Sequence, residues 1–149
     1  MATRPKRGGI YLIALEPAVG HKVTENRPAL VVQNDTYNRN SATILVAPIT
    51  STVRLPLPPL HVLLPADSST GLTVRSVAVF DQIRAVDRKR LVKKLGAVDA
   101  LVQAQADEAI RAAFGLTVSL LDLVRESPPT ITDAISRSTA DFKTGRYEG

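Results

Sequence analysis

Apolar residues in the first part of the chain fall into short runs that polar and turn-forming residues separate. Each run is five to seven residues long, which is typical of a β-strand and too short for an amphipathic helix. The predicted strands are residues 9–15, 29–33, 43–47, 60–64 and 76–80. Because loops join mostly neighbouring strands, the pattern favours a small, strongly curved antiparallel sheet or barrel.

The spacing of apolar residues changes to that of a helix after Asp99, which is expected to cap its N-terminus. Gly115 is expected to end this helix, and a shorter helix or turn is predicted for residues 87–94. The expected apolar face comprises Leu101, Val102, Ala106, Ala109, Ile110, Ala113 and Phe114. The predicted fold class is therefore mainly β with helices (α+β), with the C-terminal helix packed on the sheet.

The chain is expected to form one domain over residues 1–116, followed by an extension over residues 117–149. The extension contains an apolar stretch, the pair Pro128-Pro129, and apolar residues at helical spacing beyond it. A helical extension is predicted, either decorating its own domain or lying in an apolar groove.

Composition excludes several classes of site. The chain has no cysteine, so it has no disulfide and no thiolate zinc site. No apolar run approaches the length of a membrane span, and a cytoplasmic protein is expected. The formal net charge of +5 suggests a polyanionic partner, although the basic run of residues 88–94 is equally explained as a solvated face.

The segment from Arg27 to Ser51 carries the strongest chemical signal. Arg27 stands just before one predicted strand, and Thr50 just after the next. If these strands pair antiparallel, their outer ends meet and a guanidinium lies beside a hydroxyl. Such a pair suits the binding and cleavage of a phosphodiester.

Several blocks in order resemble the MazF/PemK toxin family, over about residues 6–116. They are RGGIYL at residues 7–12, EPAVG at 16–20, RPALVVQNDTYN at 27–38, TILVAPITS at 43–51 and DQIR at 81–84. The chain departs from the family pattern at Gly9, where an acidic residue is usual, and in the extension, which has no counterpart.

The resemblance implies a small SH3-like, CcdB/PemK-like antiparallel barrel that forms a homodimer. It also implies a toxin of a toxin–antitoxin system, silenced by a cognate antitoxin protein. The activity implied is metal-independent, sequence-specific cleavage of single-stranded RNA, in which the 2′-hydroxyl attacks and leaves a 2′,3′-cyclic phosphate and a 5′-hydroxyl. No cofactor or metal is expected.

Arg27 and Thr50 resemble the catalytic arginine and threonine of the family. Arg27 is expected to grip phosphate oxygens and stabilise charge, because a guanidinium keeps its proton; the alternative is an ion pair with Glu16 or Glu25. The Thr50 hydroxyl is expected to donate to the phosphate or relay a proton, and the alternative is a turn threonine that bonds its own backbone.

Further residues are candidates for catalysis or substrate binding. His21 is of a type that suits proton transfer near neutrality, and it is interpreted either as a substrate contact or as a bystander in an exposed loop. Asp81 is able to accept the 2′-hydroxyl proton or to pair with Arg84 or Arg75. Gln82 is expected to contact a base edge or to support the site structurally. Ser51, like Thr50, is expected either to contact the phosphate or to bond its own backbone.

A second group is expected to contact RNA. The candidates are Asn34, Tyr37, Asn38, Arg39 and Arg84, the first four on a predicted polar loop. Single-stranded RNA is recognised through base edges and stacking, and Tyr37 is the best-placed stacking candidate. His61 lies in an apolar context forty residues from His21, and it is interpreted as structural.

Two other functions remain open at this point. The same fold serves related toxins that bind DNA gyrase without cleaving nucleic acid. A self-inhibited RNA-binding homologue is the other alternative, with the extension occupying the groove that an antitoxin uses.

Overall fold

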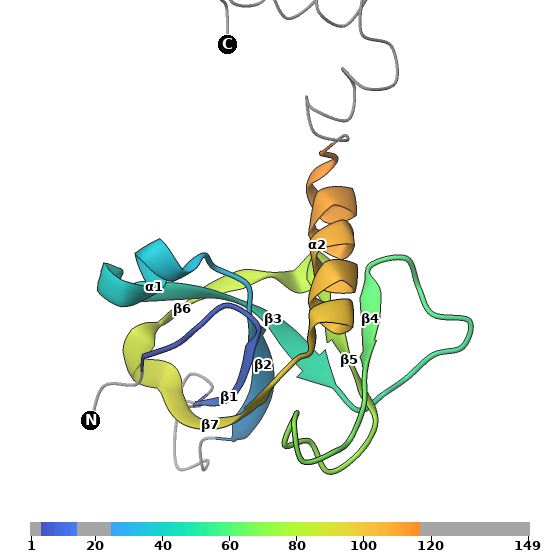
Figure 1. Cartoon of the computed structure of the whole chain (residues 1–149), viewed down its shortest axis with the longest axis horizontal. Coiled ribbons are helices and arrows are strands. Elements are labelled where there is room, and N and C mark those ends of the chain that lie inside the picture. Colours follow the sequence, from blue (N-terminus) through green and yellow to red (C-terminus); the bar gives the residue numbers. More distant parts are fainter. Residues whose placement is uncertain (1–3, 15–24, 117–149) are drawn as a thin grey trace, which may run out of the picture. The chain divides into compact units, whose positions relative to one another are not determined.

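The structure is a computed structural model, and it describes residues 4–14 and 25–116. Figure 1 shows a curved antiparallel sheet with one long helix beside it. The described strands are β1 (Gly9–Ala14), β2 (Asn26–Val31), β3 (Thr43–Thr50), β4 (His61–Leu64), β5 (Ser76–Val79), β6 (Arg84–Asp87) and β7 (Leu91–Ala97). The helices are α1 (Asp35–Asn40), α2 (Ala100–Phe114) and the 3-10 turns η1 (Phe80–Gln82) and η2 (Arg88–Arg90).

Strand β3 is the centre of the sheet. The strand order is β4-β5-β3-β2-β1-β7, and β6 also pairs with β3. One edge of β3 pairs with β2, while its other edge pairs first with β6 over Thr43–Val46 and then with β5 over Ile49–Thr50. All of these pairings are antiparallel, so the predicted fold class is confirmed.

Strands β6 and β7 and helix α1 were not predicted from the sequence, and residues 87–94, predicted as a short helix or turn, contain η2 and the start of β7. In β6 and β7 the fully buried residues are Val86 and Leu91, so these charged strands lack the apolar alternation that marks a strand. The predicted polar loop instead contains α1, where the Asn34 side chain accepts from the Tyr37 amide as the N-cap. Six residues are too few to show helical periodicity in a sequence.

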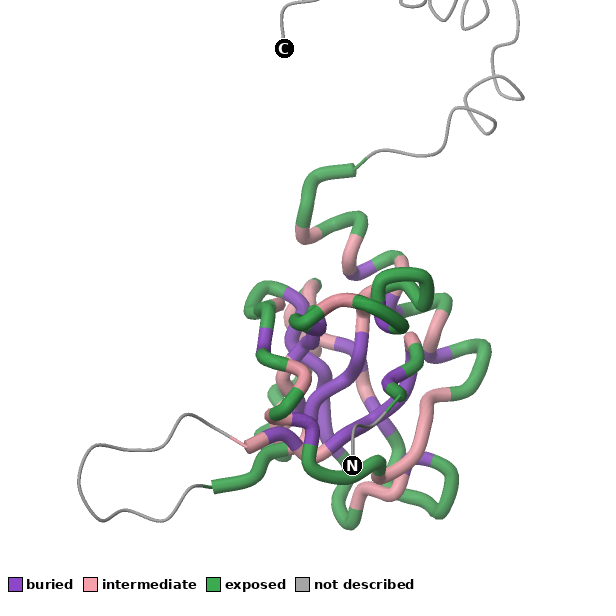
Figure 2. The backbone as a smooth tube through the Cα atoms, turned by 90° about the vertical axis from the view of Figure 1, so that its left-hand side faces the viewer, coloured by how far each residue is buried: buried purple, intermediate pink, exposed green. Residues whose placement is uncertain are grey.

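The buried residues form two clusters, which Figure 2 shows as the purple interior. One cluster lies between the sheet and α2 and includes Ile10, Leu30, Ile49, Leu64 and Phe80. The other comprises Tyr11, Ile13, Ala29, Val31, Ile44, Val46, Val86 and Leu91. Because side chains alternate along a strand, β2 and β3 contribute residues to both clusters.

Helix α2 begins and ends where its sequence predicts. The Asp99 carboxylate accepts from the Val102 amide at 2.9 Å, and Gly115 adopts the left-handed conformation with φ of 70°. Val102, Ala106 and Ala109 are buried against the sheet. The predicted apolar face is too wide, because Leu101 and Phe114 are 69% and 64% exposed.

A tight turn fixes the segment that follows β4. The Asp67 carboxylate accepts hydrogen bonds from the hydroxyl and amide of Ser69 and from the amide of Thr70, which lower its pKa. A Cβ at Gly96 would overlap the Ser69 carbonyl oxygen, so the turn packs directly on β7. This close approach requires glycine and positions the chain leading to β5.

Some predictions fall outside the described residues. His21 lies in the range 15–24, and the predicted helical extension lies in the range 117–149. The proposed domain boundary at residue 116 stays a prediction. Among the residues that the structure describes, no helix is long and apolar enough to cross a membrane.

Candidate active site

The candidate site lies where β2 and β3 separate. Their pairing ends at Ala29 opposite Pro48, although β2 starts at Asn26 and β3 continues to Thr50. Continued by two residues, the same register sets Arg27 opposite Thr50. Beyond the paired part β2 stays with β1, whereas β3 pairs with β5. Pro28 and Pro48 both lack a backbone donor, which favours this separation.

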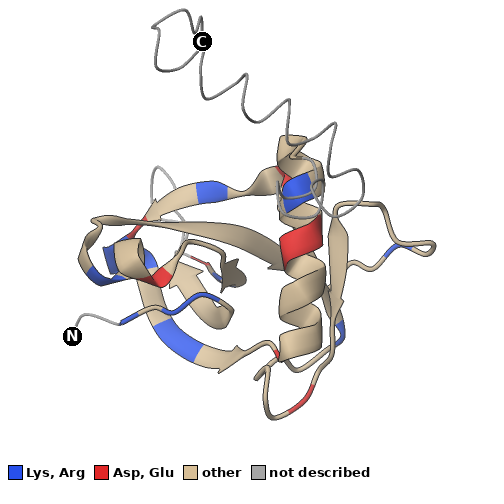
Figure 3. Ribbon diagram, turned by 45° about the horizontal axis from the view of Figure 1, so that its top comes forward, with Lys and Arg blue, Asp and Glu red and all other residues tan. Residues whose placement is uncertain are grey.

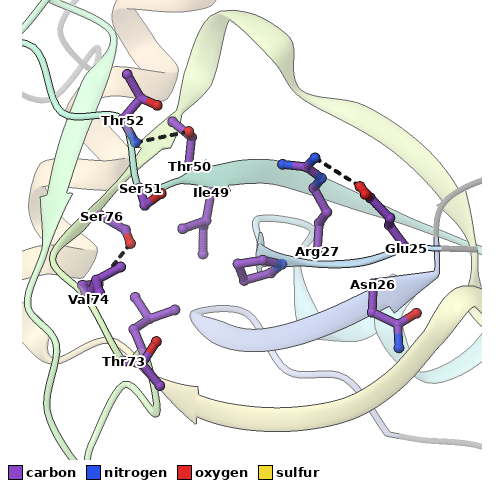
Figure 4. Close-up of a pocket in the computed structure, with 12 residues that line it drawn as sticks. Glu25, Asn26, Arg27, Ile49, Thr50, Ser51, Thr52, Thr73, Val74 and Ser76 are labelled. Atoms are coloured by element: carbon purple, nitrogen blue, oxygen red, sulfur yellow. Dashed lines mark hydrogen bonds and ion pairs between the residues drawn. The ribbon is translucent and has the colours of Figure 1, made fainter.

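A cavity of about 440 Å³ lies between the separated strand ends. Figure 4 shows Glu25 and Arg27 on one side and Thr50, Ser51 and Thr52 on the other. The residues leading to β5 complete the lining, and they are Leu72, Thr73, Val74 and Ser76. The predicted pair therefore shares one cavity and faces across it.

The Arg27 side chain is paired with a carboxylate. Its Nη2 donates to Glu25 Oε2 at 2.9 Å, and the two side chains are 60% and 66% exposed. An ion pair this exposed contributes little to stability and exchanges readily with another anion. Arg27 is therefore able to pair with Glu25 in the free protein and to bind a phosphate when one is present.

Thr50 occupies the last position of β3. Its Oγ1 accepts from the Thr52 amide at 3.2 Å, as the alternative reading of this residue predicted. That bond uses a lone pair of the hydroxyl oxygen and leaves the hydroxyl proton for another acceptor. The backbone contact therefore orients the hydroxyl and leaves it able to donate.

A second cavity of about 410 Å³ shares Thr50 and Thr52 with the first. Asp81 and Gln82 of η1 line it, and both are exposed. Two residues that the sequence analysis did not assign to the site, Arg54 and His61, line it as well. The end of β3 thus stands between two adjoining cavities that together hold Arg27, Asp81 and Gln82.

Most of the predicted RNA-contacting residues lie far from Thr50. Asn34, Tyr37 and Arg39 belong to α1 or its cap, and α1 precedes Thr43 at the opposite end of β3. Thr43 and Thr50 are the two ends of the eight-residue strand β3, a span of roughly 23 Å. Arg84 pairs with Val46 in the middle of β3. The structure does not bring these residues to the cavities.

The buried position of Asn38 contradicts the prediction that its side chain contacts RNA. It is only 1% exposed, and its amide donates to the Gln33 carbonyl at 2.7 Å and to Asp35 Oδ1 at 3.1 Å. Its Oδ1 accepts from Gln33 Nε2 at 3.1 Å. These bonds hold α1 against the end of β2, so the Asn38 side chain does not reach a base.

Basic residues are spread over the domain. Figure 3 shows Lys and Arg on several separate elements, including β7, α1 and the N-terminal segment. Within residues 4–14 and 25–116 the positive charge is therefore not concentrated at one cavity, and Arg27 and Arg54 are the described arginines that line the two cavities above. Within the described ranges, no group of three or more His, Cys, Asp or Glu side chains is arranged to hold a metal ion.

Comparison with known proteins identifies the family. The family model described as "PemK-like, MazF-like toxin of type II toxin-antitoxin system" matches residues 6–114, which is most of the chain. The chain belongs to this family. The expectation drawn from the sequence blocks is therefore confirmed, and the matched range contains every described residue of both cavities.

Curated relatives in the MazF/PemK family include endoribonucleases. The chain is 38% identical to Endoribonuclease EndoA of Bacillus subtilis over 111 residues, covering 74% of this chain and 95% of the relative. It is 39% identical to Endoribonuclease MazF9 of Mycobacterium tuberculosis over 111 residues, covering 71% and 92%. Among solved structures, MazE-MazF (Form-II) from Deinococcus radiodurans matches with a TM-score of 0.66 and 28% identity, covering 77% of this chain and 99% of that one.

In this MazF/PemK domain, the residues missed at the site carry weak sequence signals. Arg54 follows Thr50 by four residues but stands in a proline-rich stretch without strand character. His61 begins β4, whose alternation leaves His61 and Leu63 partly exposed and buries Val62 and Leu64. That alternation would have placed His61 on the face of β4 that is partly exposed to solvent. Nothing in the sequence would have brought residues 72–76 to the cavity, since the turn on Gly96 positions them.

Proposed function

We propose that this MazF/PemK-family toxin cleaves single-stranded RNA at a short sequence, with the RNA 2′-hydroxyl as nucleophile and without a metal. The supporting observation is that Arg27 and Thr50 line one cavity, opposite each other in the extended register of β2 and β3. RNA supplies its own nucleophile, so the protein has to orient the 2′-oxygen, move two protons and stabilise a negatively charged phosphorane.

Arg27 is assigned the stabilisation of phosphorane charge. Its guanidinium is exposed on the cavity wall and held by a surface ion pair with Glu25. A phosphate carries two oxygens that match the fork of N–H donors, and this bidentate contact is stronger than the contact with one carboxylate oxygen. Binding RNA therefore exchanges Glu25 for the scissile phosphate as the partner of Arg27.

Thr50 is assigned the donation of a hydrogen bond to a phosphate oxygen. The Thr52 amide occupies one acceptor site of the hydroxyl and so orients the proton away from the backbone. A donor fixed in this way needs no reorganisation as charge develops on the phosphate. Ser51 lines the same cavity and is proposed as a secondary contact.

In the reaction, the 2′-oxygen bonds to phosphorus, and the bond from phosphorus to the 5′-oxygen breaks. The 2′-hydroxyl proton passes to a base, and a proton reaches the departing 5′-oxygen, which gives a 2′,3′-cyclic phosphate and a 5′-hydroxyl. Asp81 is proposed as the base, because it is exposed in the cavity that shares Thr50. No ion pair holds Asp81 among the described residues, so neither Arg75 nor Arg84 competes for it there.

The partners proposed follow from the family. The family comprises toxins of type II toxin–antitoxin systems, which supports a cognate antitoxin as the protein partner. A homodimer and a cytoplasmic location are proposed on the same basis. His21 is proposed as a substrate contact, and it lies outside the described residues.

The experiment that tests this chemistry uses one RNA oligonucleotide containing a mapped cleavage site and a copy with a single 2′-deoxy nucleotide before the cut. We expect the first to be cut in EDTA and to give 5′ ends that a polynucleotide kinase labels directly. The deoxy copy should remain intact. Cleavage of the deoxy copy, or products that already carry a 5′-phosphate, would contradict attack by the 2′-hydroxyl.

A further inference from the structure

The second cavity contains more polar side chains than cleavage requires. Arg54, His61, Asp81 and Gln82 line it, together with Thr50 and Thr52 at the end of β3. Pro48 and Val79 provide apolar surface in the same cavity. Its volume of about 410 Å³ lies within the range of small-ligand sites, roughly 300–1,000 Å³, and accommodates one nucleotide.

The polar groups in this cavity are available to a ligand. Arg54, Asp81 and Gln82 are exposed, and none of their side chains makes a hydrogen bond or ion pair with another described residue. They offer a guanidinium, a carboxylate and an amide, so the site combines a phosphate ligand with groups that accept from and donate to a base edge.

His61 differs from Arg54, Asp81 and Gln82 because one of its ring nitrogens is buried inside the protein. Its Nδ1 is buried and has no hydrogen-bond partner. A buried N–H without an acceptor is rarer and costlier than an unused lone pair. We therefore assign the proton of the neutral ring to Nε2, so that His61, a residue of the cavity lining, has a donor at its second ring nitrogen.

His61 is also fixed in position. Its backbone amide donates to the Pro58 carbonyl at 3.0 Å, and it pairs with Val79 in the ladder between β4 and β5. The same residue also lines a third cavity, together with Gln105 and Glu108 of α2. A rigid donor on a strand is suited to select among ligands by geometry.

We propose that this cavity is a nucleotide subsite beside the scissile phosphate, in which His61 determines base specificity. The inference rests on the proposed function, because Thr50 connects the subsite to the cavity of Arg27. Arg54 binds the phosphate of the nucleotide, and the Nε2–H of His61 donates to an acceptor on the base edge. Asp81 and Gln82 lie across the same subsite, and Pro48 and Val79 contact the face of the base.

The proposal predicts different effects for its two named residues. Loss of a base contact relaxes selectivity at one position, whereas loss of a phosphate contact weakens binding of all sequences alike. His61→Leu replaces the imidazole in β4 with an apolar side chain of similar size and removes the donor. Arg54→Ala removes an exposed guanidinium, so it keeps the proposal testable if His61→Leu fails to fold. Gln105→Ala alters the third cavity, which His61 also lines, and serves as the matched control.

The experiment incubates each full-length protein with a random-sequence RNA pool in EDTA and sequences the new 5′ ends. Circular dichroism melting checks that each variant is folded. We expect wild type and Gln105→Ala to give the same base preferences around the cut. His61→Leu should lower the preference at one position by roughly 5- to 50-fold. Arg54→Ala should slow cutting of all sequences without changing the preferred bases.

Three results would overturn the inference, and they are distinguishable. If wild type cuts at a preferred sequence and folded His61→Leu keeps that preference at every position, the subsite is wrong while the nuclease stands. An Arg54→Ala variant that cuts all sequences at the wild-type rate would remove the phosphate contact in the same way. If folded wild type cuts no RNA, the proposed function fails and the subsite fails with it.

Discussion

Arg27 and Glu25 form an ion pair on the wall of the larger candidate cavity, with 2.9 Å between Nη2 and Oε2. The guanidinium proposed to bind the scissile phosphate therefore has a carboxylate partner only two residues away in the chain. Both side chains are more than half exposed, so the pair is weak and RNA has to displace Glu25.

Glu25→Gln should strengthen RNA binding, because it removes the competitor for Arg27 and one negative charge near the phosphate. Exposed ion pairs are worth roughly 0.2–1 kcal/mol, which predicts a dissociation constant lower by up to about 5-fold. Fluorescence anisotropy with a 2′-deoxy oligonucleotide of the preferred sequence measures this directly. If binding is unchanged and turnover falls more than tenfold, Glu25 takes part in the chemistry and the competitor account is wrong.

Thr50→Val should lower kcat by roughly 100- to 1,000-fold with little change in KM, because it removes a donor aimed at developing charge. Thr50→Ser retains the hydroxyl and should stay within about tenfold of wild type by the same argument. Steady-state cleavage of a fluorogenic RNA gives both constants. Equal losses in the valine and serine variants would indicate that the methyl group, and not the hydroxyl, is what matters.

Asn38→Ala should destabilise the domain without altering cleavage specificity. The substitution leaves the part-buried Gln33 carbonyl without its side-chain partner, which costs roughly 1–3 kcal/mol. Tyr37→Ala, at a side chain that is 63% exposed, is the matched control and should unfold like wild type. Urea denaturation measures the free energy of unfolding. A stable Asn38→Ala protein with altered base preference would restore Asn38 as a base-reading residue.

Asp107 should make part of the stability depend on pH. Burial raises the pKa of this carboxyl, but hydrogen bonds from Arg7 and Gln103 outweigh burial, and the pKa lies below its ordinary value. A carboxyl with a depressed pKa in the folded state stabilises the protein above its unfolded pKa of about 3.9. That contribution is lost as the pH falls through the folded pKa.

Asp107→Asn should therefore narrow the difference in unfolding free energy between neutral and acidic solution, because its amide does not titrate. Urea denaturation of both proteins at pH 7 and at about pH 3 measures this difference. The same pH dependence in both proteins would mean that other carboxyls, such as Asp35, account for it. The pKa of Asp35 is also lowered, first by the Arg7 amide and then by the Asn38 side chain.

The fold was largely predictable because its core strands carry their own apolar runs. Helix α2 was predicted to the residue at both ends, since Asp99 and Gly115 are local capping signals. Strands β6 and β7 were missed because tertiary pairing with β3 and β1, and not burial of alternate residues, defines them. Helix α1 depends on a cap and a buried Asn38 within a stretch too short to show a period.

Only the part of the candidate site that the register between β2 and β3 determines was predictable from the sequence. Arg27 and Thr50 were paired from the expectation that neighbouring strands are antiparallel, and the pairing of Ala29 with Pro48 agrees. The separation of the strand ends into a cavity follows from two prolines and from the two other partners, β1 and β5. The RNA contacts expected from Asn34, Tyr37 and Arg39 stay a prediction, and a sequence does not reveal that α1 lies at the other end of β3 from the cavities.

The most direct test of the account is to map the ends produced when the purified full-length protein acts on a long, weakly structured RNA in EDTA. Wild type and Arg27→Ala would be compared after melting curves show that both are folded. The proposed chemistry predicts recurrent cuts at one short motif with wild type and none with Arg27→Ala. Intact RNA after incubation with folded wild type, or the same cuts made by Arg27→Ala, would contradict it.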